Sequence, residues 1–238
     1  MNEEEKKYNT PDFVFGAAAP ENPGALMPAK VGFAAPEFAV LTLDGGTLKL
    51  SGLREKGHVA FMTGAVTSPM CAYEIPALNR LHERFGNQGV YFFLLYTRES
   101  HPGERYPHHT SLEQKIAHAR DLQRLEDVRV PVLVDDLAGT VHRNYCIWPN
   151  AAFVIHRDGR LVYRCNIMNS AELGQYLDDL VRADRLAAEG EMLHTQYSER
   201  VVLHHAEQKV HHRVYERAGS KAFEDYWKVR PDLRNRWP

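Results

Sequence analysis

The fold is decided by residues 58–96, which read HVAFMTGAVTSPMCAYEIPALNRLHERFGNQGVYFFLLY. Residues 58–63 are a short run with an apolar centre, as expected of a buried parallel strand. The next segment changes period, because Ile75, Leu78 and Phe85 recur at helical spacing. Residues 89–96 form a second apolar run. The stretch therefore predicts a strand, a helix over residues 71–85 closed by Gly86, and a second strand.

The rest of the chain extends this unit on both sides. Upstream, residues 38–41 and 48–50 predict two strands around a Gly45-Gly46 turn. Downstream, a polar loop over residues 97–110 precedes alternating elements. These are a helix at 111–125, a strand at 130–134, a helix at 138–145, strands at 151–155 and 161–165, and a helix capped by Ser170. This order predicts an α/β fold with a mixed central β-sheet flanked by helices.

Three regions follow from composition. Residues 1–30, rich in Pro, Ala, Gly, Glu and Asn, are interpreted as an N-terminal arm. Residues 31–188 form the α/β domain, and residues 189–238 form a polar, mostly helical extension. That extension holds His194, His204, His205, His211 and His212. The i, i+4 spacing of helical metal pairs is absent, so no metal is expected there. Aromatic residues, including Tyr215, Tyr226 and Trp237, predict that the extension packs on its own domain or on a second subunit.

Charge and cysteine content exclude several classes of protein. The 238 residues carry a formal net charge of −2 without a long Lys/Arg run, so neither nucleic acid nor a membrane surface is an expected partner. No apolar stretch of ~18 residues predicts a membrane span, and the N-terminus does not resemble a secretory signal. Three cysteines are too few for a disulfide framework. We therefore expect a cytoplasmic protein.

Several motifs resemble those of known enzymes. Residues 31–38, VGFAAPEF, are similar to the opening of peroxiredoxins of the alkyl hydroperoxide reductase type. Residues 67–78, TSPMCAYEIPAL, resemble the peroxiredoxin active-site segment. Residues 96–102, YTRESHP, are similar to the Glu-Ala-His-Pro stretch of iodothyronine deiodinases, which carry Thr-selenocysteine-Pro where this chain has residues 67–69. The resemblance covers about residues 31–185 and implies a thioredoxin-like fold of the redoxin superfamily.

Cys71 is the candidate nucleophile. Pro69 favours the first turn of a helix, so Cys71 is expected near the helix N-terminus, where unpaired N–H groups stabilise a thiolate. Ser68 stands three residues earlier and is expected to donate to the thiolate or orient a peroxide. Glu74, one turn later, is expected to organise hydrogen bonds around the pocket. The alternative is a small buried core thiol, because free cysteine is among the most buried residue types.

The chain departs from both families at two positions. The resemblance implies an arginine near residue 150, but the chain has Asn150, so Arg98 or Arg143 would have to supply the charge. The position of the deiodinase selenocysteine is Ser68, and a deiodinase mechanism would therefore depend on Cys71. The family also places a cis proline opposite the redox helix. We therefore expect the Trp148-Pro149 bond to be cis, or the loop otherwise to lie tightly against Cys71.

The remaining candidates lie in loops. Cys146 is a possible resolving thiol or a loop-filling residue, and Cys165 is interpreted as sheet packing. No Cys-x-x-Cys pair exists, which disfavours two-cysteine disulfide exchange. Glu99 and His101 follow the strand at 89–96, and carboxyl ends of strands are where ligands bind in α/β sheets. His101 could act as a general acid oriented by Glu99, or both could be solvated loop residues.

Three hypotheses follow. In the first, Cys71 reduces a hydroperoxide or related electrophile, and Cys146 or an external thiol reductant restores it. In the second, the same thiolate removes a halogen from a halogenated substrate while His101 supplies a proton. In the third, the chain is a non-catalytic redoxin scaffold that binds a partner or metal through its His-rich C-terminal extension. The active-site segment would comprise Thr67, Pro69, Trp148, Pro149 and Asn150. No cofactor is expected. The protein is expected to form a homo-oligomer.

Overall fold

The computed structural model describes residues 1–13, 27–198, 205 and 207–234. A seven-stranded mixed sheet forms the centre, in the order β2-β1-β5-β4-β3-β6-β7. Its strands are β1 Ala39–Thr42, β2 Thr47–Lys49, β3 His58–Gly64, β4 Val90–Tyr96, β5 Val132–Val134, β6 Ala152–Ile155 and β7 Leu161–Cys165.

The middle of the sheet is parallel. β3 pairs with β4 in parallel from His58↔Val90 to Gly64↔Tyr96, and β4 pairs in parallel with β5. β1 and β6 join this centre antiparallel, and β2 and β7 complete the edges. Because β3 and β4 end side by side, the segments that follow Gly64 and Tyr96 leave the sheet at the same edge. Ligands bind at such an edge in open α/β sheets.

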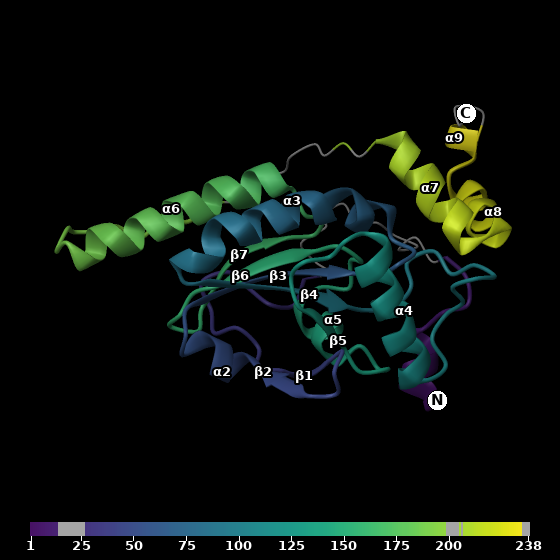
Figure 1. The fold of residues 1–238 in the computed structure, drawn as a ribbon, viewed down its shortest axis with the longest axis horizontal. Helices are drawn as coiled ribbons and strands as arrows, with labels where there is room; N and C mark the ends of the chain where they lie inside the picture. Colours follow the sequence, from purple (N-terminus) through teal and green to yellow (C-terminus); the bar gives the residue numbers. More distant parts are fainter. Residues whose placement is uncertain (14–26, 199–204, 206, 235–238) are drawn as a thin grey trace.

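Helices cover both faces of the sheet (Figure 1). α3 Pro69–Phe85, α4 Leu112–Leu125 and α6 Ser170–Ala188 pack on one face, and α2 Leu50–Arg54 and α5 Thr140–Tyr145 on the other. Successive residues of β3 alternate between the faces: Ala60 and Met62 join the first core, Val59 and Phe61 the second. Since each large apolar side chain contributes ~1.5–3 kcal/mol when buried, this two-sided burial fixes the strand's register.

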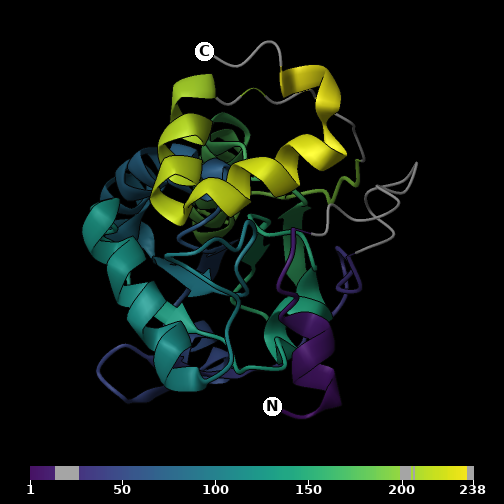
Figure 2. The same cartoon turned by 90° about the vertical axis from the view of Figure 1, so that its right-hand side faces the viewer.

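Both ends of the chain return to the domain. Near the N-terminus, α1 Glu3–Tyr8 places Tyr8 in a buried position, where its hydroxyl bonds His142 Nδ1 at 2.7 Å. At the other end, α7 Gln208–Ala218, α8 Ser220–Val229 and α9 Pro231–Arg234 form a helical group above one end of the sheet (Figure 2). α7 contacts α3 directly. The helical character predicted for the extension is confirmed for residues 208–234 by these three helices, whereas residues 189–198 are not helical, and His204 and Trp237 lie outside the described residues.

The predicted elements are confirmed, with differences at their ends. Asn169, not Ser170, caps α6, because its side chain accepts from the N–H groups of Ala171 and Glu172. Gly86 keeps a right-handed conformation and continues into the short 3-10 helix η2 Gly86–Gln88. The left-handed residue that ends this segment is Gly89, with φ of 78°. α1 and α2 were not predicted, because they have too few residues to show a helical period.

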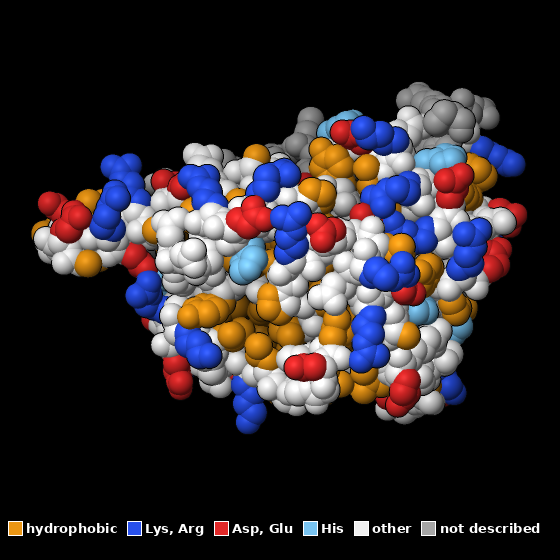
Figure 3. Space-filling model, in the orientation of Figure 1, with side chains coloured by type: hydrophobic (Ala, Val, Ile, Leu, Met, Phe, Trp, Pro, Cys, Tyr) orange, Lys and Arg blue, Asp and Glu red, His pale blue; other side chains and the backbone are white. Residues whose placement is uncertain are grey.

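The surface agrees with the nearly neutral charge of the chain. In Figure 3, Lys and Arg side chains alternate with Asp and Glu over the visible face, without a large field of one sign. Among the described helices, none combines the length and the apolar character that crossing a bilayer requires.

Candidate active site

A pocket of about 200 Å³ lies at the edge where β3 and β4 end. Its wall combines the start of α3, the loop after β4, the loop before β6 and parts of both chain ends. The lining residues are Thr10, Phe13, Ser68, Pro69, Met70, Arg98, Glu99, Ser100, His101, Ile147, Trp148, Pro149, Asn150, Ile167, His211, Tyr215 and Tyr226. The structure thus brings most of the predicted site residues together around one cavity.

Ser68 and Cys71 define the first turn of α3. Ser68 is the N-cap, and its Oγ accepts a hydrogen bond of 3.3 Å from the backbone N–H of Cys71. Pro69 occupies the first helical position, where its missing N–H costs no helical hydrogen bond. The predicted placement of Cys71 within one turn of the helix N-terminus is therefore confirmed. The Ser68 hydroxyl oxygen, however, accepts a hydrogen bond from the backbone N–H of Cys71, whereas it was expected to donate to the Cys71 thiolate or to orient a peroxide.

The Cys71 thiol is sealed inside the protein. The residue is 0% exposed and belongs to the core between the sheet and α3. Burial raises the pKa of Cys71 far above its usual value, and the negative charge of Glu126 raises it further. The expectation of a solvent-accessible, primed thiolate is thus wrong for this conformation. Desolvation outweighs the favourable helix terminus, a balance that spacing along the sequence does not reveal.

A positive charge that favours the thiolate of Cys71 comes from the C-terminal extension. Arg217 of α7 donates to the Val66 carbonyl at 3.4 Å and pairs with the Glu126 carboxylate, and its charge lowers the pKa of Cys71. Of the two arginines expected in this role, Arg98 lines the pocket, while Arg143 is exposed on α5. The sequence could not indicate Arg217, because it lies in the extension, far from Cys71 along the chain.

Glu99 is the centre of a buried hydrogen-bond network. Its carboxylate accepts from Thr67 Oγ1 at 2.6 Å, from His109 Nε2 and His118 Nδ1 at 3.0 Å each, and from the Tyr96 hydroxyl at 2.5 Å. Burial alone would raise the pKa of Glu99, but the bonds from the two histidines outweigh it and hold the pKa well below its usual value. Glu99 is therefore a fixed internal anion.

His101 does not receive its orientation from Glu99. Its backbone N–H donates to Thr67 Oγ1 at 3.1 Å, and its ring stacks on Phe13 at 4.1 Å between centroids. Nε2 lies 3.4 Å from the Tyr215 hydroxyl. Burial, aided by the charge of His211, lowers the pKa of His101 to about 3. The ring is neutral at pH 7, so the predicted role as a protonated general acid is wrong in this conformation.

Glu74 does not contribute to the pocket. It is buried on α3, and its carboxylate bonds Ser170, the first residue of α6. Burial raises the pKa of Glu74, while the bonds to Ser170 oppose the shift. Glu74 therefore joins two helices on one face of the sheet, because its side chain follows α3 away from the cavity.

The loop before β6 is held against the pocket by its backbone. The Trp148 carbonyl accepts from Thr63 Oγ1 at 3.2 Å and from His142 Nε2 at 2.8 Å. No cis peptide bond occurs in the described part of the chain, so the expected cis form of Pro149 is wrong. The alternative expectation, a loop that lies tightly against Cys71, stays a prediction: Trp148 and Pro149 share the pocket lining with Ser68, three residues before Cys71, but Cys71 does not line the pocket.

Cys146 lies on the opposite side of the sheet from Cys71. It belongs to the core that contains Val59 and Phe61, and the Trp148 N–H donates to its Sγ at 3.4 Å. Burial raises the pKa of Cys146 to about 12 and that of Cys165 to about 11. All three cysteines are free thiols. This placement argues against Cys146 as the resolving partner of Cys71.

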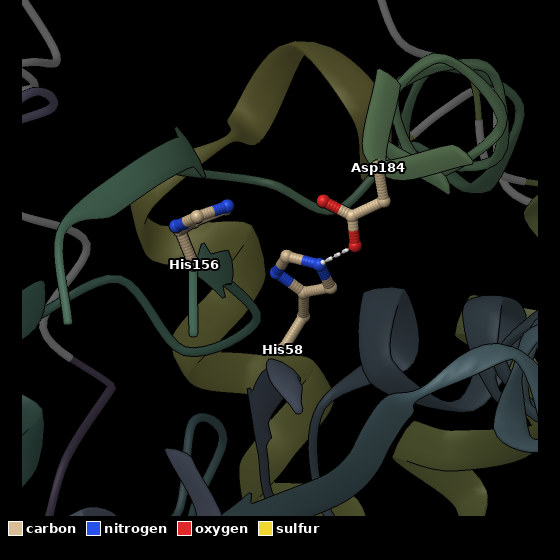
Figure 4. A group of neighbouring side chains, drawn as sticks. All are labelled: His58, His156 and Asp184. Carbon is tan, nitrogen blue, oxygen red and sulfur yellow. Dashed lines mark hydrogen bonds and ion pairs between the residues drawn. The ribbon is translucent and has the colours of Figure 1, made fainter. Parts of the chain in front are cut away.

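Two clusters of described residues offer metal-ligand atoms, Glu99–His109–His118 and His58–His156–Asp184. In the second, His58 Nε2 bonds Asp184 at 2.7 Å, as Figure 4 shows, and Arg157 already pairs with the same carboxylate. His58 Nδ1 accepts from the Arg157 N–H at 3.2 Å, so this cluster is a salt-bridged network. In the first cluster the ligand atoms already bond one another around Glu99.

Several residues of the site were not predicted. His109 lies in the stretch predicted as a polar loop but is fully buried, and His118 and Tyr96 complete the Glu99 network. Phe13 and Tyr226 line the pocket from opposite ends of the chain. The aromatic content of the extension predicted burial, but nothing in the sequence indicated that it would cover this edge of the sheet.

The mixed sheet, the helix that begins beside the pocket and the sequence motifs define a thioredoxin-fold protein of the redoxin superfamily. The chain belongs to the AhpC/TSA family, whose model matches residues 31–164. Thiol-disulfide oxidoreductase ResA of Bacillus thuringiensis subsp. konkukian is 25% identical over 134 residues, which cover 56% of this chain and 68% of ResA. A ResA of Bacillus cereus is 27% identical over 135 residues, with the same coverage.

Solved structures support the fold. The thioredoxin domain of a thiol-disulfide oxidoreductase from Bacteroides vulgatus matches with a TM-score of 0.52 at 15% identity, covering 64% of this chain and 98% of that one. A thiol:disulfide interchange protein from Bacteroides sp. matches with a TM-score of 0.53 at 14% identity, covering 66% and 93%. The predicted thioredoxin-like fold is confirmed.

Proposed function

We propose that this protein is a thiol-dependent oxidoreductase that reduces a small organic electrophile, such as an organic hydroperoxide, through Cys71. The observation that carries the proposal is the position of this thiol, one helical turn behind Ser68, which lines the pocket. Family membership supports a thiol reaction, and the similar ResA proteins are named thiol-disulfide oxidoreductases. The apolar and aromatic lining favours an organic substrate over hydrogen peroxide itself.

The reaction balances with one thiol. The sulfur attacks the terminal oxygen of the hydroperoxide, the S–O bond forms as the O–O bond breaks, and the thiol proton leaves with the alcohol. Cys71 is then a sulfenic acid. Two equivalents of an external thiol reduce it back to the Cys71 thiol, and they leave as their own disulfide together with water. An external reductant is required because Cys146 lies across the sheet.

The sealed thiol has to become accessible before it reacts. α7 packs against α3, and Arg217 joins α7 to the Val66 carbonyl between β3 and α3. A shift of α7 with the first turn of α3 would open the thiol toward the pocket. Such local openings draw on the least stable parts of a fold. The proposal therefore includes a slow opening step before the chemistry.

The test compares cumene hydroperoxide consumption, with dithiothreitol as reductant, in the wild type and two variants. Cys71→Ala is expected to reduce turnover to the rate of the reagents alone. Cys165→Ala, which removes another low-exposure thiol, is expected to keep at least half of the wild-type rate. Equal rates for wild type and Cys71→Ala would overturn the proposal and leave a non-catalytic binding protein, a function that the complete burial of Cys71 favours.

Reductive dehalogenation is a second candidate, favoured by the aromatic lining formed by Phe13, Trp148, Tyr215 and Tyr226. In that reaction the Cys71 sulfur takes the halogen as a sulfenyl halide while the carbon–halogen bond breaks, and the carbon takes the proton that the thiol gives up. One external thiol then displaces the halide and forms a mixed disulfide with Cys71, and a second one restores the Cys71 thiol. An iodinated phenol with release of iodide as the readout separates this activity from peroxide reduction. Cys71-dependent iodide release supports it, and no release above the reagent blank excludes it.

A further inference from the structure

The pocket wall contains polar atoms that lack partners. Ser100 Oγ, His101 Nδ1, Trp148 Nε1 and Asn150 Nδ2 are each sealed from solvent and make no hydrogen bond within the described residues. All four residues line the same cavity. An unsatisfied buried polar group costs roughly 1–3 kcal/mol, and native proteins rarely keep several together without a reason. Their grouping around one cavity indicates a site whose polar contacts are completed by a ligand.

The chemistry of these atoms selects an acceptor on the ligand. The Trp148 indole and the Asn150 amide nitrogen can only donate, and Ser100 and neutral His101 can also donate. Arg98 adds a positive charge: its guanidinium bonds the Tyr8 carbonyl at 3.1 Å and has no carboxylate partner among the described residues. The one acidic residue in the wall, Glu99, is occupied by its own network and has no free proton to offer.

Most of the remaining wall is apolar or aromatic, and Thr10, Ser68 and His211 are its other polar members. Phe13, Tyr215 and Tyr226 group around the His101 ring, with centroid distances of 4.1, 4.7 and 5.8 Å to it. Met70, Ile147 and Ile167 complete the surface. Flat aromatic ligands pack against such rings by offset or edge contacts. A cavity of about 200 Å³ limits the ligand to roughly one ring and a short substituent.

We infer that the pocket binds a small aryl carboxylate, with the ring among the aromatic side chains and the carboxylate on Arg98 and on the unpaired donors, whose side chains turn toward the cavity on binding because solvent does not reach them in this structure. The inference rests on the proposed function and deepens it, since it takes the pocket to be the substrate site and holds that the substrate carries an aryl carboxylate in addition to the group that Cys71 reduces. Asn150 is the residue that sets specificity, because its amide is fully buried and can donate to a carboxylate.

The test measures binding of sodium benzoate to the full-length protein at pH 7 by titration calorimetry or ligand-observed NMR. Benzyl alcohol, which has the ring without the charge, and acetate, which has the charge without the ring, are the comparison ligands. Benzoate is expected to bind at least about tenfold more tightly than either. Equal binding of benzoate and benzyl alcohol, or no detectable benzoate binding, overturns the inference.

A pair of isosteric variants locates the site. Asn150→Asp replaces a donor by a negative charge and is expected to weaken benzoate binding at least about tenfold without changing benzyl alcohol binding. Asn144→Asp makes the same charge change at an exposed position of α5 and is the control. If Asn150→Asp lowers the melting temperature strongly, Arg98→Met carries the test with the same expected loss. Unchanged benzoate binding in the folded variant overturns the inference.

The two proposals fail separately. Benzoate binding needs no thiol, so Cys71→Ala is expected to bind benzoate like the wild type even when it has lost peroxide consumption. Conversely, Cys71-dependent peroxide consumption without benzoate binding would retain the proposed function and reject the ligand class.

Discussion

Cys71 and Cys146 face opposite cores, one on each side of the central sheet. A disulfide bond between them requires Cα atoms within about 7 Å, and the strands stand between their side chains. We therefore expect brief peroxide treatment of the native protein to give no Cys71–Cys146 disulfide in peptide mass spectra. The same treatment in a denaturing concentration of urea is the control and should give mixed disulfides. A native Cys71–Cys146 peptide would show that the sheet opens during oxidation.

Burial protects the Cys71 thiol from alkylation. Its raised pKa and zero exposure predict that iodoacetamide modifies Cys71 at pH 8 far more slowly in the native than in the unfolded chain. Arg217→Ala removes the bond to Val66 and one of the two ion pairs between α7 and Glu126, the other being Arg213–Glu126, and should speed this reaction at least about tenfold. Arg124→Ala, which breaks an exposed pair with Asp121, is the control and should change nothing. Equal rates of Cys71 alkylation in the wild type and in Arg217→Ala would show that α7 does not limit access to the thiol.

Acid should destabilise the protein through its buried histidines. Burial lowers the pKa values of His101 and His142 to about 3, whereas in the unfolded chain they are near 6.5. The unfolded state therefore binds more protons below about pH 6.5, and stability falls as pH falls toward 3. Each histidine contributes a slope of about 1.4 kcal/mol per pH unit to the free energy of unfolding.

Denaturant titrations between pH 7 and 4 check this slope. His101→Phe, which keeps an aromatic ring beside Phe13, should reduce the slope by about 1.4 kcal/mol per pH unit. His194→Phe, at an exposed position, should leave the slope unchanged. If the free energy of unfolding of the wild type does not change between pH 7 and 4, the imidazole rings of His101 and His142 are not buried in the neutral form.

Gly64 makes room for the Cys71 sulfur at the end of β3. A Cβ at position 64 would overlap Cys71 Sγ, so Gly64→Ala should destabilise the protein by about 1–3 kcal/mol. In a Cys71→Ala background the nearest remaining atoms are Cys71 Cβ at 3.5 Å and Leu94 Cδ2 at 3.6 Å, both ordinary contacts. The cost of Gly64→Ala should therefore largely disappear there. Gly52→Ala, where a Cβ meets open space, is the control. If the costs of Gly64→Ala and Cys71→Ala simply add in the double variant, the Cys71 sulfur does not lie against Gly64.

The sequence predicted the fold well because its strongest signals are periodic. The apolar run of β4 and the helical spacing of Ile75 and Leu78 depend only on neighbouring residues, and both elements formed where expected. α1 was missed because six residues carry no period, and Tyr8 is held by tertiary contacts to His142 instead.

The site was predicted less completely, because it depends on contacts between distant segments. Ser68 and His101 were placed in the right pocket by motif and strand position. The protonation state of His101 and the sealed Cys71 follow from burial, to which the C-terminal extension contributes through Tyr215 and Arg217. Glu99 was expected to bond His101, but His109 and His118, ten and nineteen residues later, occupy it.

The region shared with the AhpC/TSA family ends at residue 164, yet three aromatic walls of the pocket, Phe13, Tyr215 and Tyr226, lie outside it. The aromatic part of the pocket wall is thus supplied largely from outside the family region, whereas Cys71, Arg98 and Asn150 lie within it. Proteins that inherit the common core could exchange their terminal segments and acquire new small-molecule preferences while the helix that bears Cys71 stays untouched. The ends of such chains are therefore the first place to look when relatives differ in what they accept.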